Sequence, residues 1–126
     1  MTVEFRLTDI WRSYWAQRLL WLIDGTLTFN GANAFQIRNV HSYYKDFLNE
    51  QRMYLKTEKL VEFLTNWQCG WSKFYECVID LSKGMADEGF WEQQEVIGIK
   101  KWINDLKAVG YIEPVIKKSQ VMILVL

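Results

Sequence analysis

The sequence predicts a mainly α-helical fold of four to five helices with one short β-hairpin. Half of the 126 residues are hydrophobic and 16% are aromatic, which is enough apolar surface for a buried core. Apolar side chains recur at helical spacing in several long segments. Asn30-Gly31 lies between two short alternating segments and is typical of a hairpin turn, because both residue types accept a positive φ.

The N-terminal segment predicts a strand followed by a buried helix. Residues 3–7 alternate apolar and polar side chains, as in a strand with one buried face. Thr8 or Asp9 is suited to cap a helix over residues 10–23, which Gly25 would end. Apolar residues cover most of this helix, so we expect it to lie buried between layers.

The middle of the chain predicts the hairpin and two successive helices. Residues 26–30 and 34–39 form the strands of the expected hairpin. Helical spacing begins again from Ser42, and Thr57 is expected to cap a separate helix whose apolar face continues to Trp67.

Two more helices are expected in the last third of the chain. One extends from about Trp71 to near Gly84. The other has the clearest pattern, with one face made by Ile99, Trp102, Ile103, Leu106 and Val109. Gly110 suits the left-handed position that ends a helix, and we expect Trp102 to lie at the centre of the buried face.

The charge distribution excludes some partners. Fifteen basic residues balance fifteen acidic ones, and no basic patch indicates nucleic-acid binding. No apolar run approaches the roughly 20 residues that a membrane span requires, so we expect no span in this chain. Residues 2–6 include the polar Thr2 and the charged Glu4 and Arg6, a mixed-charge start that does not indicate a signal peptide.

The two cysteines, Cys69 and Cys77, are too few to form a metal site by themselves. They either pair in an oxidising compartment or remain as two buried thiols. We favour the thiols slightly, because the composition gives no independent sign of secretion. The only histidine, His41, follows the predicted hairpin, where a loop or helix-cap role is expected. The adjacent pair Asp87-Glu88 indicates a solvated loop and not a pair of catalytic carboxylates.

One face of the first helix has the residue types of a sugar-binding site. Trp11, Tyr14, Trp15 and Arg18 share this face at helical spacing. Aromatic planes stack on sugar rings, and a guanidinium group binds diphosphates through paired hydrogen bonds. The alternative is a buried structural helix, in which Asp9 is the cap and Arg12 is its ion-pair partner.

Residues 9–21 read D-I-W-R-S-Y-W-A-Q-R-L-L-W. This segment resembles the pattern D-I-W-R-(S/G)-Y-W-x-Q-R-L-L-W of the STELLO family of glycosyltransferases. The resemblance covers residues 3–114, with residues 8–23 the specific part. It implies that residues 1–114 are the C-terminal helical part of a GT-A-like α/β glycosyltransferase domain, with residues 115–126 an unplaced apolar tail.

The resemblance also implies a setting and partners. Members of the family are Golgi membrane proteins with an N-terminal anchor and a lumenal domain. A nucleotide sugar, a glycan acceptor and the upstream half of the domain are the implied partners, with Mn²⁺ or Mg²⁺ in the full-length protein. In the Golgi lumen, Cys69 and Cys77 would be linked across the turn at Gly70.

The sequence departs from this enzyme type, since we expect neither an anchor nor a nucleotide-binding βαβ half in this chain. It contains no Asp-x-Asp motif, so no cofactor or metal ligand is assigned to this chain. Within a complete site, Asp9 is the predicted base for the acceptor hydroxyl, while Arg12, Trp15 and Arg18 are the predicted substrate-binding residues. The isolated chain is expected to be inactive. The alternative function is a non-catalytic helical protein-interaction module.

Overall fold

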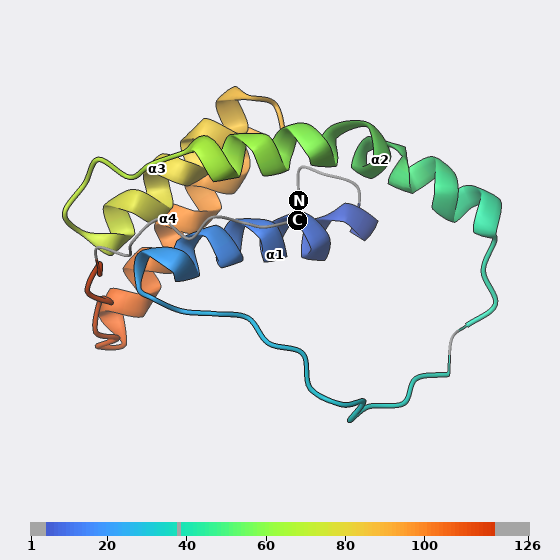
Figure 1. Cartoon of the computed structure of the whole chain (residues 1–126), viewed down its shortest axis with the longest axis horizontal. Coiled ribbons are helices and arrows are strands. Elements are labelled where there is room, and N and C mark those ends of the chain that lie inside the picture. The colour runs from blue at the N-terminus through green and yellow to red at the C-terminus, as the bar shows by residue number, and fades with distance from the viewer. Residues whose placement is uncertain (1–4, 38, 118–126) are drawn as a thin grey trace.

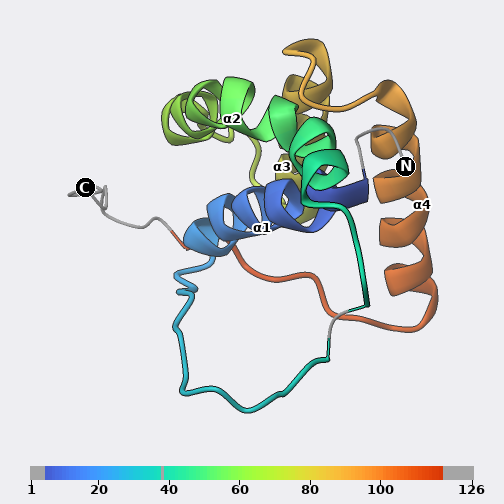
Figure 2. The same cartoon turned by 90° about the vertical axis from the view of Figure 1, so that its right-hand side faces the viewer.

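The computed structural model describes residues 5–37 and 39–117. Four helices form the fold: α1 (Phe5–Leu22), α2 (Tyr43–Asn66), α3 (Phe74–Asp87) and α4 (Gln93–Ala108). Helix α1 packs on α2 and α3, and α3 packs on α4 (Figure 1). Figure 2 shows α4 standing across the axis of α1. The mainly helical prediction is confirmed, whereas the described residues contain no strand and give no support for a GT-A-like α/β domain.

The core lies where the four helices meet. Trp11 of α1 is only 1% exposed and packs edge to face on Phe90, with ring centroids 6.1 Å apart. Buried apolar side chains from every helix surround this pair: Leu7, Leu19, Leu60, Leu64, Val78, Leu81, Met85 and Ile103. The face of α1 that carries Trp11 therefore lies within the core that joins the four helices.

The predicted N-terminal strand is wrong from Phe5 onward, because α1 already includes that residue. Residues 3 and 4 lie outside the described part of the chain. Leu7 and Trp11 are both buried, and their i, i+4 spacing continues the apolar face of the helix towards its start. Thr8 and Asp9 consequently lie inside the helix and do not cap it.

Helix α1 ends in a Schellman motif one residue earlier than predicted. Asp24, and not Gly25, takes the left-handed conformation, with φ of 63°. The amide of Gly25 then donates to the carbonyl of Leu20 at 2.8 Å. The same motif follows α4, where Gly110 has φ of 78° as predicted.

The predicted hairpin is wrong. Residues 25–37 and 39–42 form an irregular loop that arcs away from the bundle (Figure 1). Helices α1 and α2 run in the same direction, so the chain must return along the full length of α2, about 36 Å, before that helix begins. A hairpin would bring the chain back to its own starting point. An isolated two-stranded hairpin is also barely stable without a surface to pack on.

Helix α2 is continuous where the sequence predicted two helices. Ser42 caps it, its hydroxyl accepting from the Lys45 amide at 3.4 Å. Thr57 lies inside the helix, and its hydroxyl accepts instead from the indole of Trp11 at 3.3 Å. The residue that resembled a cap therefore serves a contact between helices.

Helix α3 continues past Gly84, where its end was expected, to Asp87. A Cβ atom at Gly84 would lie 2.8 Å from Cζ of Phe63. The glycine therefore leaves room for the Phe63 ring of α2 against α3 and does not end the helix.

In α4, the buried face differs from the predicted one. Ile103 is 2% exposed, but Trp102 is 50% exposed and cannot be the centre of the face. Val96, Ile99, Ile103 and Leu106 follow one side of the helix at i, i+3, i+7 and i+10. Neighbouring positions on a helix point about 100° apart, so Trp102 and Ile103 could not both be central.

The segment after α4 passes back over the bundle. The Glu113 carboxylate accepts from the Tyr75 amide at 2.7 Å, at the start of α3. The Lys117 amide donates to the Leu22 carbonyl at 2.8 Å, at the end of α1. Of the apolar tail over residues 115–126, residues 118–126 lie outside the described part.

Cys69 and Cys77 are joined by a disulfide bond, with their Cα atoms 5.4 Å apart. The slightly favoured expectation of two thiols is therefore wrong. The pairing depends on the α2–α3 connection folding back onto α3, which sequence spacing alone does not determine. The bond attaches this connection to the buried Cys77 side of α3.

Reducing this disulfide is expected to lower the free energy of unfolding by about 2.5 kcal/mol, because the bond closes a short loop in the unfolded chain. Urea unfolding with and without a phosphine reductant measures the effect. A double variant, Cys69→Ala with Cys77→Ala, is the control and should not respond to reductant. Equal midpoints for the oxidised and reduced parent protein would contradict the expectation.

Candidate functional site

Asp9, the predicted catalytic base, lies on an exposed part of α1. One carboxylate oxygen accepts from the amide of the neighbouring Ile10 at 2.9 Å. Its carbonyl accepts from the hydroxyl of Ser13 at 2.7 Å. Its carboxylate is therefore accessible to solvent near the N-terminal end of the helix.

Arg12 connects α1 to α4. Its guanidinium donates to the Glu95 carboxylate at 2.7 Å, while the Arg12 side chain stays half exposed. Glu95 lies in the first turn of α4, where a carboxylate also interacts favourably with the helix dipole. The expected pairing of Arg12 with Asp9 gives way to this bond between helices.

Trp15 connects α1 to α3. Its indole N–H donates to the hydroxyl of the fully buried Ser82 at 3.1 Å. Its ring meets Trp91 edge on, with centroids 6.2 Å apart. Half-buried between these two partners, the ring packs in the bundle instead of forming an open stacking platform.

Arg18 connects α1 to the C-terminal end of α2. Its Nε donates to the Leu64 carbonyl at 2.9 Å, and Nη2 donates to the Trp67 carbonyl at 2.6 Å. The last carbonyls of a helix have no hydrogen-bond donor within that helix. Here the Arg18 guanidinium donates to two of the carbonyls at this end of α2. Its central carbon also lies 5.0 Å from the centroid of the Trp67 ring. Burial lowers the pKa of Arg18, which still remains protonated at neutral pH.

The four candidates do not converge on one cleft. Arg12, Trp15 and Arg18 each bind a different neighbouring element: α4, α3 and the end of α2. Asp9 and Arg18 are nine residues apart, about 13 Å along the helix axis. The catalytic and substrate-binding roles stay predictions, and the contacts seen here are structural.

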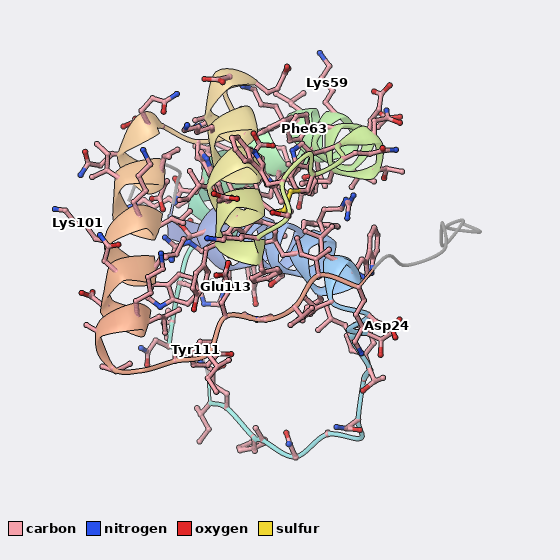
Figure 3. All side chains as sticks on the ribbon, turned by 90° about the vertical axis from the view of Figure 1, so that its left-hand side faces the viewer. Asp24, Lys59, Phe63, Lys101, Tyr111 and Glu113 are labelled. Carbon is pink, nitrogen blue, oxygen red and sulfur yellow. A yellow bond between two sulfur atoms is a disulfide. The ribbon has the colours of Figure 1, made fainter. Side chains whose placement is uncertain are left out.

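An open groove of about 770 Å³ lies along α2. Its lining comes from α2 and from the ends of the neighbouring connections: Leu55, Lys56, Lys59, Glu62, Phe63, Asn66, Trp67, Glu88 and Phe90. Figure 3 shows Lys59 extended into solvent and Phe63 close to α3. The sequence did not indicate this groove, because its lining combines segments about 25 residues apart.

The chemistry of the groove suits a neutral ligand. Two lysines and two glutamates line it, so their charges cancel. Its apolar lining includes Leu55, Phe63 and Trp67, whereas Phe90 is only 4% exposed. The balanced charge gives a diphosphate group no net electrostatic attraction.

Among residues 5–37 and 39–117, no cluster of three or more His, Cys, Asp or Glu side chains could hold a metal ion. The residues present do not form the site that a GT-A-type metal requires. None of the described helices is both long and apolar enough to cross a bilayer.

The sequence motif of α1 indicated the class of protein, and a comparison with family profiles tests it. A family profile described as STELLO glycosyltransferases matches residues 6–122. The chain therefore belongs to the STELLO glycosyltransferase family, as the α1 segment indicated.

Two relatives come from Arabidopsis thaliana. Probable glycosyltransferase STELLO1 is 35% identical over 114 residues, which are 90% of this chain and 14% of the relative. Probable glycosyltransferase STELLO2 is 32% identical over 114 residues, or 90% of this chain and 15% of the relative. The chain thus spans about a seventh of the length of these relatives. No solved structure matches it significantly.

Proposed function

We propose that this chain is the C-terminal helical part of a STELLO-type glycosyltransferase, which transfers a sugar from a nucleotide sugar to a glycan acceptor. Family membership carries the proposal, together with a match over 90% of the chain. To test the activity, a purified full-length relative is incubated with a nucleotide sugar and a glycan acceptor. Mass spectrometry of the acceptor then measures whether a sugar has been added.

Within such an enzyme, the bundle supports the active site and the rest of the protein holds the nucleotide. Three of the candidate residues of α1 are bonded to neighbouring helices, which favours a structural role for the motif. The balanced charge of the groove favours a neutral glycan over a nucleotide diphosphate. A divalent metal, Mn²⁺ or Mg²⁺, would bind in the rest of the full-length protein.

The proposed location is the Golgi lumen. The disulfide between Cys69 and Cys77 supports it, because such bonds form and persist in oxidising compartments of the secretory pathway.

We expect that the isolated chain neither hydrolyses UDP- or GDP-sugars nor transfers sugar from them in the presence of Mn²⁺. Its described residues form no metal site, and its sequence contains no Asp-x-Asp motif. Release of UDP or GDP, followed with a coupled assay, measures this. A full-length relative assayed under the same conditions is the control. If the purified 126-residue chain releases more UDP or GDP than a heat-denatured sample does, the proposal that the rest of the protein holds the nucleotide is wrong.

The second candidate function is a non-catalytic interaction module. The large exposed apolar surface on the long loop and on α2 favours it. Deleting the matching region from a full-length relative distinguishes the two functions. Loss of transfer supports the role in the enzyme, whereas intact transfer with loss of a bound partner supports the module.

A further inference from the structure

The long loop and the first half of α2 carry apolar side chains that the described residues of this chain leave exposed. We refer to residues 26–37 and 39–55 as the apolar arm. Phe29 and Val40 are fully exposed, at 104% and 106%. Phe35, Ile37, Tyr43 and Tyr44 are also mostly exposed. So many exposed apolar side chains in one segment of a folded protein indicate that the segment contacts another surface.

The geometry of the arm presents this surface outward. The loop arcs away from the four helices, and the first half of α2 projects beyond the N-terminal end of α1 (Figure 1). Within the described part of the loop, residues 26–37 and 39–41 make no backbone–backbone hydrogen bond. The buried residues of α2, Leu60 and Leu64, both lie in its second half. The bundle therefore supports the second half of α2 and contacts the arm through Arg52 and Met53, near the point where the arm joins that half.

The charges of the arm indicate what kind of surface covers it. Over residues 26–55 the sequence has three basic residues, Arg38, Lys45 and Arg52, and two acidic ones, Asp46 and Glu50, so the net charge is only +1. Such a balance gives no attraction to an anionic membrane or to nucleic acid. An uncharged apolar protein surface is the matching partner.

The family match indicates where that protein surface is found. It spans residues 6–122 and therefore includes the whole arm, so the arm is part of the region common to the family. More than four-fifths of each relative lies outside the matched region. We propose that the apolar arm is the surface by which this helical region docks onto the remaining part of a STELLO-type glycosyltransferase chain. This inference rests on the proposed function and names the partner of the bundle.

Hydrogen exchange measured by mass spectrometry tests the docking. In full-length STELLO1, amides aligned with residues 26–37 should exchange at least tenfold more slowly than the same amides in this isolated chain. Serines at the two positions of STELLO1 aligned with Phe29 and Phe35 should restore fast exchange. A serine at the position aligned with Trp102, an exposed aromatic on α4, is the matched control and should change nothing in the loop. Equally fast exchange in the full-length protein and in the isolated chain would overturn the proposal.

Two measurements on the isolated chain test the other occupants. Light scattering after size exclusion should give a monomer. A dimer that Phe29→Ser with Phe35→Ser dissociates, but that Trp102→Ser does not, would assign the arm to a second copy and overturn the proposal. Flotation with phosphatidylcholine vesicles should leave the chain unbound, and binding through the arm would also overturn it. None of these measurements depends on catalysis, so the docking and the proposed activity can fail separately.

Discussion

Replacing Trp11 with alanine is expected to lower the free energy of unfolding by about 3–5 kcal/mol. The indole is 1% exposed, packs edge on against Phe90 and donates to Thr57 of α2. Its removal opens a cavity at the point where the helices meet and leaves the Thr57 hydroxyl without this donor. Urea unfolding followed by far-ultraviolet circular dichroism measures the change without depending on tryptophan fluorescence.

Trp102→Ala is the matched control for that experiment. The residue type and the truncation are the same, but the Trp102 side chain is half exposed on α4. We expect a loss of about 1 kcal/mol or less, because little apolar surface returns to water. Equal losses for the two variants would show that the core does not centre on Trp11.

Replacing Arg18 with leucine is expected to destabilise the fold by about 3 kcal/mol, since two charge-assisted hydrogen bonds are lost and two carbonyls at the end of α2 lose their donor. Arg18→Lys is the control. It keeps the charge but lacks the planar guanidinium fork that bonds both carbonyls, so its loss should be smaller than that of Arg18→Leu. Thermal and urea midpoints of the three proteins measure the series.

The same series decides between the two roles of Arg18. A guanidinium that faces a substrate can be replaced with no loss of stability, or even with a gain. If Arg18→Leu unfolds at the parent midpoint, the hydrogen bonds from Arg18 to α2 contribute nothing to stability. The predicted substrate-binding role of Arg18 is then favoured. If it unfolds well below the parent, the motif of α1 acts through the fold.

The candidate site illustrates how far the sequence could lead. It placed Trp15 and Arg18 on one face of a helix, which is correct, because helical periodicity is a local property. The partners of that face come from Leu64 and Ser82, more than forty residues away along the chain. A helix face with aromatic and guanidinium groups has the same sequence pattern whether it binds a sugar or packs on another helix. The local pattern therefore could not distinguish a substrate-binding face from a structural one.

The sequence by itself determined the helical class, the family and the left-handed end of α4 at Gly110, because each depends on short-range pattern. Only the tertiary structure decided the rest. The parallel course of α1 and α2 replaced the predicted hairpin with a long return loop, and the packing of Phe63 against Gly84 let α3 continue. The folding of the α2–α3 connection brought Cys69 to Cys77. Each of these outcomes depends on contacts between residues that are distant in the sequence. The spacing of residues within one segment carries no information about the energy of such contacts.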